Sequence, residues 1–258
     1  MDIITELLRE NDRLIILLAR LSGIVFAPIF NTRTIPAIWK VSFIVITAIF
    51  AWKFGFAAAY QPPEEIFAYV ITIAIEITTG LIIALTAQFF FAAIQLAGQI
   101  IDTQMGFGIM NVIDPLSGTQ APILGNFKFI LAILVFLNID GHHLLIQAFF
   151  DSYRIIPIGQ ISLETNFLQL LIKDFGNIFV IGLKLSLPIV GALLFADVVL
   201  GIIARTVPQM NIFMVGMPAK ILLGFGVLLA SVPLYIYYLN TLIEDMFIQI
   251  YNIIRTLV

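Results

Sequence analysis

The sequence predicts an all-α integral membrane protein built from long, broken helices and helical hairpins. Apolar residues make up 61% of the 258 residues, and the mean hydropathy is +1.07. Charged residues account for only 11%, whereas a soluble domain usually has about 25%. Several apolar regions are also longer than the roughly 20 residues that cross a bilayer. These observations predict helices that bend, fold back or extend beyond the lipid.

Six apolar regions follow one another along the chain. The third and fifth run well past a single span, and we expect Pro188 to bend the fifth and Pro233 to bend the sixth. A tail of two helices is expected to begin near Ile172 to Asn177. The six regions are Leu14 to Phe30, Ile38 to Tyr60, Ile66 to Ile101, Ile123 to Phe150, Phe167 to Ala204 and Ile221 to Val258.

Composition also excludes several classes of function. The absence of cysteine excludes disulfides, thiolate metal sites and a cysteine nucleophile. A net charge of -3 without a basic cluster argues against nucleic acid as a partner. No nucleophile elbow, phosphate loop or acidic metal cluster is found, so we expect neither an enzyme nor a bound cofactor.

Five of the charged residues inside the apolar regions need an explanation, because a charge there requires a partner or a wet surface. Lys184 and Asp197 are 13 positions apart, on nearly opposite faces of a straight helix and about 20 Å apart, so they are not expected to pair with each other. A pair within the chain, a side chain that snorkels near a helix end, and a countercharge from a partner subunit remain open. The five are Arg20, Glu76, Lys128, Lys184 and Asp197. We expect four of them, Arg20, Glu76, Lys184 and Asp197, to be buried.

Two features could suggest a functional site, but their residue pattern favours a structural role. His142 and His143 could suggest a metal or a proton relay, yet neighbouring helical positions diverge by about 100° and no other histidine or cysteine completes a ligand set. We therefore expect a structural or capping role and no metal site. Phe89 to Phe91 most simply pack in a core, with a role as a pore gasket as the alternative.

The stretch from Gly98 to Phe127 is a long polar break, punctuated by Gly, Pro and Asn, in an otherwise apolar helical chain. Irregular backbone at membrane depth is tolerated only where protein buries it or where it lines a water-filled space. Soft methionine side chains on glycine-rich backbone suit a plug that closes a pore. An ordinary connecting loop is the alternative. The candidate plug residues are Met105, Gly106, Phe107, Gly108, Ile109, Met110, Asp114, Pro115, Gly118 and Gln120.

A second polar break, from Ala204 to Lys220, separates the last two apolar helices. We expect Pro208 and Pro218 to stop the helices and the polar side chains to be unpaired at a hairpin tip, where they could contact a partner. The candidate tip residues are Arg205, Pro208, Gln209, Asn211, Gly216 and Lys220.

Four segments together carry a family resemblance. They are LARLSGIVFAPIFNTRTIPAIWK, GQIIDTQMGFGIMNVIDPLSGTQAPILGNF, FLNIDGHHLLIQAF and ARTVPQMNIFMVGMPAK. With these segments the chain resembles, over essentially its whole length, the FliR/SctT family of type III export-gate proteins. GTQAPILGNF and PQMNIF favour the flagellar branch over the injectisome branch.

The resemblance implies a function and a set of partners. Members of this family join FliP and FliQ in a closed helical assembly that contains a single FliR copy, with FlhB near the entrance, in the bacterial inner membrane at the flagellar basal body. The resemblance implies a FliP-like part at 1–172 and a FliQ-like hairpin at 173–258. It also places a plug loop at 106–122 of a channel for unfolded flagellar subunits.

Two other classes of function stay open on the sequence. A secondary transporter would bind ions at Glu76, Asp197 and Lys184 between inverted repeats, although no such repeats are detected. A membrane-anchored scaffold without a pore would show no conductance in any variant of the loop.

Overall fold

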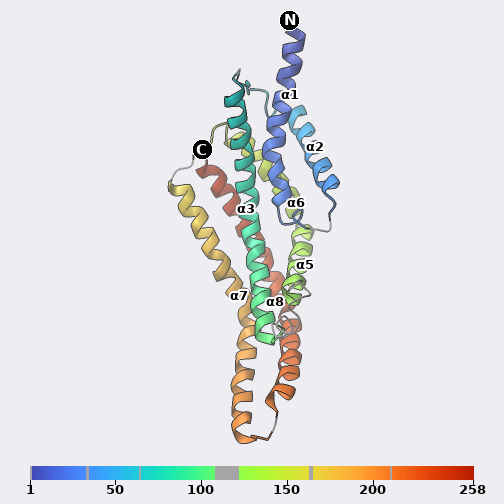
Figure 1. The fold of residues 1–258 in the computed structure, drawn as a ribbon, viewed down its shortest axis with the longest axis vertical. Coiled ribbons are helices and arrows are strands. Elements are labelled where there is room, and N and C mark those ends of the chain that lie inside the picture. Colours follow the sequence, from blue (N-terminus) through green and yellow to red (C-terminus); the bar gives the residue numbers. More distant parts are fainter. Residues whose placement is uncertain (1, 33–34, 64, 108–121, 163–164, 210) are drawn as a thin grey trace. The chain divides into compact units, whose positions relative to one another are not determined.

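A computed structural model describes residues 2–32, 35–63, 65–107, 122–162, 165–209 and 211–258 of the chain (Figure 1). The described residues form helices, turns and connecting segments and contain no strand, which confirms the predicted all-α class. The helices are α1 (Asp2–Leu21), the 3-10 helix η1 (Ser22–Phe26), α2 (Ala37–Lys53), α3 (Ile66–Met105), α5 (Ile123–Asn138), α6 (Gly141–Ile155), α7 (Thr165–Thr206) and α8 (Ile212–Thr256).

The prediction of long helices is confirmed. α3, α7 and α8 have 40, 42 and 45 residues, and each is long and apolar enough to cross a membrane. α5 and α6 would add a fourth span if the pair counts as one broken span. The fourth apolar region is thus divided at Asp140, which adopts a left-handed backbone with φ of 57°.

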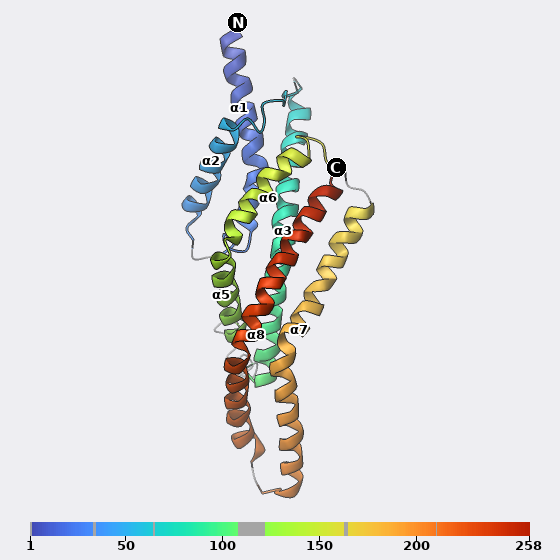
Figure 2. The same ribbon diagram turned by 180° about the vertical axis from the view of Figure 1, so that it is seen from behind.

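The start of α8 differs from the prediction. α8 begins at Ile212, so Pro218 lies inside this helix and does not stop it. Pro218 is the seventh residue of α8, so its missing N–H leaves the Met214 carbonyl without that partner, yet the helix continues through it. The break between α7 and α8 is therefore shorter than the sequence suggested, and Figures 1 and 2 both show the end of α7 beside the start of α8.

The chain forms two compact units. Unit 1 comprises 1–89, 140–174 and 243–258, and unit 2 comprises 90–139 and 175–242. α3, α7 and α8 each contribute one part to each unit. The predicted division at 172 concerns likeness to FliP and FliQ, which is a different property from compactness, so it stays a prediction.

Unit 1 packs α1, η1 and α2 against one another, and α3, α6 and the end of α8 join the same unit. Glycines permit a backbone contact here: a Cβ on Gly23 would lie 2.3 Å from the carbonyl carbon of Gly80. Tyr251 donates to the Asp151 carboxylate at 2.9 Å, and the Ser162 N–H donates to the Leu257 carbonyl at 3.0 Å.

Unit 2 is built around an apolar core from four helices. Its buried side chains come from α3, α5, α7 and α8, namely Ile101, Met105, Leu124, Ile189, Leu193 and Leu228. Met105, the first candidate plug residue, is thus fully buried in this core and not part of a free loop.

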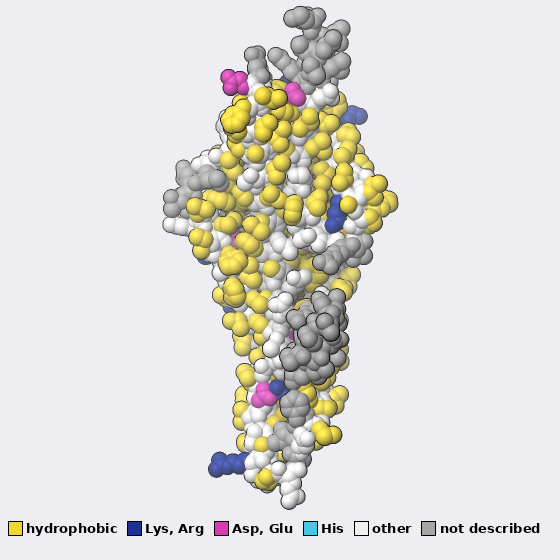
Figure 3. Space-filling model, viewed as in Figure 1, with side chains coloured by type: hydrophobic (Ala, Val, Ile, Leu, Met, Phe, Trp, Pro, Cys, Tyr) yellow, Lys and Arg dark blue, Asp and Glu magenta, His cyan; other side chains and the backbone are white. Residues whose placement is uncertain are grey.

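The surface of the chain is unusually apolar. Figure 3 shows hydrophobic side chains over much of the visible face, with few charged groups among them. Phe195 on α7 and Leu222 on α8 are 78% and 74% exposed. Exposed apolar patches of this extent mark surfaces that lipid or other proteins cover.

Candidate gating segment and its anchors

Asp102 joins the two helix ends that border the predicted plug segment. The Leu124 N–H lies 3.1 Å from each oxygen of the Asp102 carboxylate, and the Gly125 N–H donates to it at 3.3 Å. These are among the first N–H groups of α5, which have no partner within their own helix, and a carboxylate there also complements the positive end of the helix dipole. A side chain of α3 therefore caps α5.

Gly106 ends α3 with a specific hydrogen-bond pattern. The Phe107 N–H donates to the Asp102 carbonyl at 3.0 Å, and the Gly106 N–H donates to the Thr103 carbonyl at 3.2 Å. Together with a φ of 94° at Gly106, this is the Schellman arrangement that terminates helices. Gly106, which the sequence suggested as part of a soft loop, is thus the residue whose positive φ ends α3.

α3 and α5 touch through their backbones. A Cβ added to Gly98 would lie 2.1 Å from the Cα of Gly125, a distance that no side chain can occupy. Gly98 and Gly125 therefore hold the stems of the segment at direct contact. Together with the Asp102 cap, they make the chain leave α3 and enter α5 at nearly the same place.

The described part of the plug segment rests on α8. Phe107 packs edge-on against Phe225, with 6.4 Å between ring centroids. The Met217 methyl lies 3.1 Å from the position of a Cβ on Gly106, and a Cβ on Gly224 would lie 2.7 Å from the Met105 methyl. The remaining candidate plug residues lie outside the described residues: Gly108, Ile109, Met110, Asp114, Pro115, Gly118 and Gln120.

The predicted hairpin tip contains a helix cap. Asn211 precedes α8, and the Met214 N–H lies 3.3 Å from Asn211 Oδ1, the geometry of an N-cap side chain. Arg205, Pro208 and Gln209 are exposed, whereas Gly216 is buried in the first turns of α8.

The ion pair between Lys220 and Asp197 corrects one expectation and decides among the alternatives left open for Asp197. Lys220 was expected to be unpaired at the tip, but its Nζ lies 2.7 Å from Asp197 Oδ1. Gln104 Nε2 donates to the other Asp197 oxygen at 3.0 Å. Asp197 therefore has a partner within the chain, and this pair ties the stem of the plug segment to the hairpin.

Arg20 and Glu76 form the second internal pair, in unit 1. Both side chains are fully buried, with Nε to Oε2 at 2.6 Å and Nη2 to Oε1 at 3.0 Å. Arg20 also donates to Ser152 Oγ and to the Ile156 carbonyl, each at 3.3 Å. The Gly159 N–H donates to Glu76 at 2.9 Å. This bidentate pair is saturated by hydrogen bonds, which is what a buried ion pair requires.

The two remaining charged residues from the apolar regions, Lys128 and Lys184, differ in burial. Lys128, which was singled out only as a charge to explain, is 4% exposed and donates to the Leu185 carbonyl at 3.0 Å. Lys184, which was expected to be buried, is exposed because α7 turns this face away from the core of unit 2.

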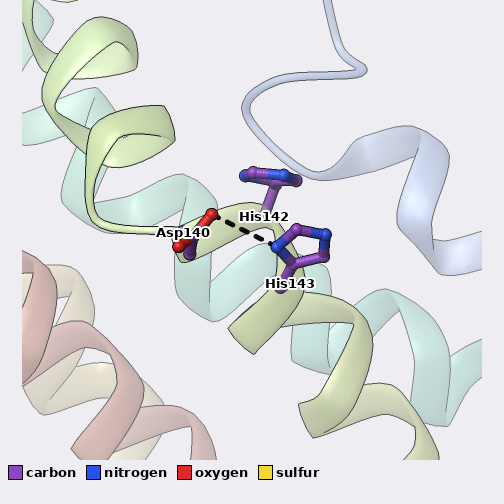
Figure 4. Close-up of side chains that lie close together, drawn as sticks. All are labelled: Asp140, His142 and His143. Atoms are coloured by element: carbon purple, nitrogen blue, oxygen red, sulfur yellow. Dashed lines mark hydrogen bonds and ion pairs between the residues drawn. The ribbon is translucent and has the colours of Figure 1, made fainter.

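Asp140, His142 and His143 gather at the start of α6, as Figure 4 shows. Their ligand atoms lie within 4.8 Å of one another, so the three could hold a metal ion. His143 Nδ1 lies 3.3 Å from Asp140 Oδ1, and these two side chains are 69% and 74% exposed. Asp140 forms no side-chain hydrogen bond that caps the backbone of α6, and His142 Nδ1 is buried without a hydrogen-bond partner among the described residues, so the structural or capping role of the histidines stays a prediction.

Comparison with known proteins decides the family. Residues 12–246 match the family described as bacterial export proteins, family 1. The chain belongs to this export family. It is 38% identical to the flagellar biosynthetic protein FliR of Bacillus subtilis over 207 residues, which cover 78% of each chain. It is also 33% identical to FliR of Escherichia coli over 242 residues, covering 94% of this chain and 90% of the relative.

A third relative agrees with these two. FliR of Pectobacterium carotovorum is 33% identical over 231 residues, covering 87% of this chain and 86% of the relative. The resemblance found in the sequence is therefore confirmed at the level of the family. Sequence reasoning missed Asp102, Gly98 and Gly125 as anchors, because periodicity within a helix does not tell which other helix it meets.

Proposed function

We propose that the chain is the FliR-type subunit of a flagellar protein export gate in the bacterial inner membrane. It would assemble as a single copy with FliP and FliQ, with FlhB near the entrance, around a channel for unfolded flagellar subunits. The observation that carries this proposal is the length of exposed apolar helix in a member of an export family.

α7 makes the argument quantitative. Its 42 residues extend about 63 Å at 1.5 Å per residue, twice the roughly 30 Å of bilayer hydrocarbon. Exposed apolar side chains occur along α7 from Leu168 to Ile202. A flat bilayer cannot cover all of them, so neighbouring protein subunits are expected to cover the rest.

In this proposal the segment Gly106 to Pro122 closes the pore. Apolar side chains at a constriction exclude water and ions by dewetting. The stems are fixed by Asp102 and by the contact of Gly98 with Gly125, so displacing the segment would leave the helices in place. A plug on rigid stems could open for a passing chain and close again.

The secondary transporter is less well supported. Glu76 is paired with Arg20, and Asp197 is paired with Lys220. An ion-binding carboxylate at the membrane midplane would need to be available to its ion, but each of these two already has a cation within the chain. Lys184 alone does not form such a site.

Removing the segment tests the plug. Residues 108–121 would be replaced with a short Gly-Ser bridge, which keeps Gly106, Phe107 and Pro122 at the helix ends. We expect the variant to assemble with FliP and FliQ and to raise potassium efflux from proteoliposomes well above wild type, because nothing fills the constriction. Arg205→Gln, at the exposed tip, is the control and should stay ion-tight. An assembled variant as ion-tight as wild type would remove the plug from the proposal and favour a scaffold without a pore.

A further inference from the structure

Unit 2 contains a small hollow of about 140 Å³ between α5, α7 and α8. Two lysines, Lys128 and Lys184, line it together with Tyr235 and Tyr238. Pro188 also lines it, and since proline has no N–H, the carbonyl of Lys184 one turn earlier loses its partner in the helix. The hollow therefore lies where the continuous helix α7 lacks one internal hydrogen bond and a backbone carbonyl is available.

The charge in this hollow has no described countercharge. Lys128 donates to the Leu185 carbonyl at 3.0 Å, and its ammonium lies 4.6 Å from the centre of the Tyr235 ring. Within the described residues no carboxylate forms an ion pair with Lys128 or Lys184. A buried ammonium held only by a carbonyl and a ring is costly unless an anion approaches it. The hollow therefore fits an anionic group.

The position of the hollow along the helices identifies the kind of anion. Lys184 and Arg205 bracket Leu185 to Ala204, a stretch of about 20 residues and roughly 30 Å, which matches the hydrocarbon thickness. The charged residue within it, Asp197, is neutralised by Lys220. This spacing puts Lys184 at the level where hydrocarbon meets the headgroups.

Tyrosines on α8 indicate the same level. Tyr238 lines the hollow beside Lys184, and Tyr237 is 72% exposed, whereas Tyr235 is buried and donates to the Lys128 carbonyl at 3.2 Å. Tyrosine is enriched where membrane hydrocarbon meets the headgroups, because its ring is apolar and its hydroxyl polar. The exposed Leu187 and Leu234, at 59% and 62%, offer apolar surface next to the hollow.

We propose that this hollow binds the phosphate of an anionic phospholipid. Lys128 supplies a fixed charge at the base, Lys184 closes over the phosphate from the mouth, and the acyl chains lie along the apolar surface of α7 and α8. The site is independent of the plug and of the channel, so it stands whether or not the chain gates a pore.

Native mass spectrometry of the full-length protein, extracted with its co-expressed partners, tests this site. The sample would be equilibrated in micelles that contain equal amounts of phosphatidylglycerol and phosphatidylcholine. We expect one retained phosphatidylglycerol per chain in wild type. Lys184→Gln should lower its occupancy on the order of tenfold, the loss expected for one charge-assisted hydrogen bond.

Lys173→Gln is the matched control, because Lys173 is exposed on the same helix and does not line the hollow. It should retain the lipid as wild type does. Lys184 is exposed, so its substitution leaves the core intact. Lys128→Gln is a second variant, and it should also retain less phosphatidylglycerol than wild type. Size-exclusion chromatography checks that it is folded.

Four outcomes would overturn the proposal. Equal retention by wild type and Lys184→Gln, or no preference for phosphatidylglycerol, would exclude a phosphate site here. Displacement of the lipid by inorganic phosphate alone would mean a site for the free ion. Loss of a neighbouring subunit in Lys184→Gln with unchanged lipid would assign the hollow to a protein carboxylate.

Discussion

At the scale of single residues, Asp102 connects the end of α3 to the start of α5 through hydrogen bonds. Its carboxylate accepts N–H groups at the start of α5 while its backbone carbonyl closes the end of α3. The end of α3 and the start of α5 are therefore held to each other directly. Arg20 plays a comparable part in unit 1, where it joins α1 to α3 and α6.

Asp102→Ala should destabilise the protein by about 1 to 2 kcal/mol, the usual cost of losing a helix cap. Asp102→Asn keeps one acceptor oxygen and should recover part of the loss. The midpoint temperature of the monodisperse peak, measured by size-exclusion chromatography after heating, reports the change. Thr103→Ala, at an exposed neighbour, is the control, and equal midpoints for both alanine variants would contradict the capping role.

Arg20→Met should be much more damaging, because it leaves the buried Glu76 carboxylate without its cation. Removing one partner of a buried pair typically costs about 3 to 5 kcal/mol, or on the order of 10 °C in midpoint for a chain of this size. Arg154→Met removes an arginine whose side chain is 70% exposed and should cost less than about 1 kcal/mol. Similar midpoints for the two variants would show that the buried pair is not needed for stability.

At the scale of elements, the helices were more predictable than their contacts. Hydropathy and prolines predicted long helices and a terminal hairpin. The separation of α5 and α6 at Asp140 was missed, although Asp140-Gly141 is a dipeptide typical of turns and aspartate is among the residues that adopt a left-handed backbone. The pairing of Asp197 with Lys220 could have been predicted from the sequence. Asp197 lies nine residues before the end of α7 and Lys220 lies eight residues after the start of α8, so a hairpin places them at the same height.

The pairing of Arg20 with Glu76 could not have been predicted from the sequence in the same way. These residues are 56 positions apart, and only the packing of α1 on α3 brings them together. The sequence identified both as charges that need a partner, but helical periodicity carries no information about which helices meet. The same limit hid the contact of Gly98 with Gly125.

Gly98→Ala tests the contact between α3 and α5. A methyl group here would overlap the backbone of Gly125, so the helices must separate and the core around Ile101 and Leu124 must loosen. We expect a clear loss of midpoint temperature. Gly201→Ala is the control: nothing lies within 4 Å of its added Cβ, and alanine favours a helix by up to about 1 kcal/mol. A Gly98 variant as stable as the Gly201 variant would contradict the close contact.

At the scale of the whole molecule, exposed apolar surface is the main property to explain. Only 11% of the most apolar 18-residue window of α7 is buried within the chain. In the proposed export gate, this surface would pack on neighbouring subunits around the channel. The lipid site proposed at Lys128 and Lys184 would account for one part of the surface, and protein neighbours would account for the rest.

Native mass spectrometry of the tagged chain, co-expressed with FliP and FliQ and extracted in mild detergent, tests the central claim most directly. The proposed gate predicts a complex in which one copy of this chain is bound to several copies of FliP and of FliQ. A lone chain or a homodimer under the same conditions would contradict the claim and return the secondary transporter as the better account.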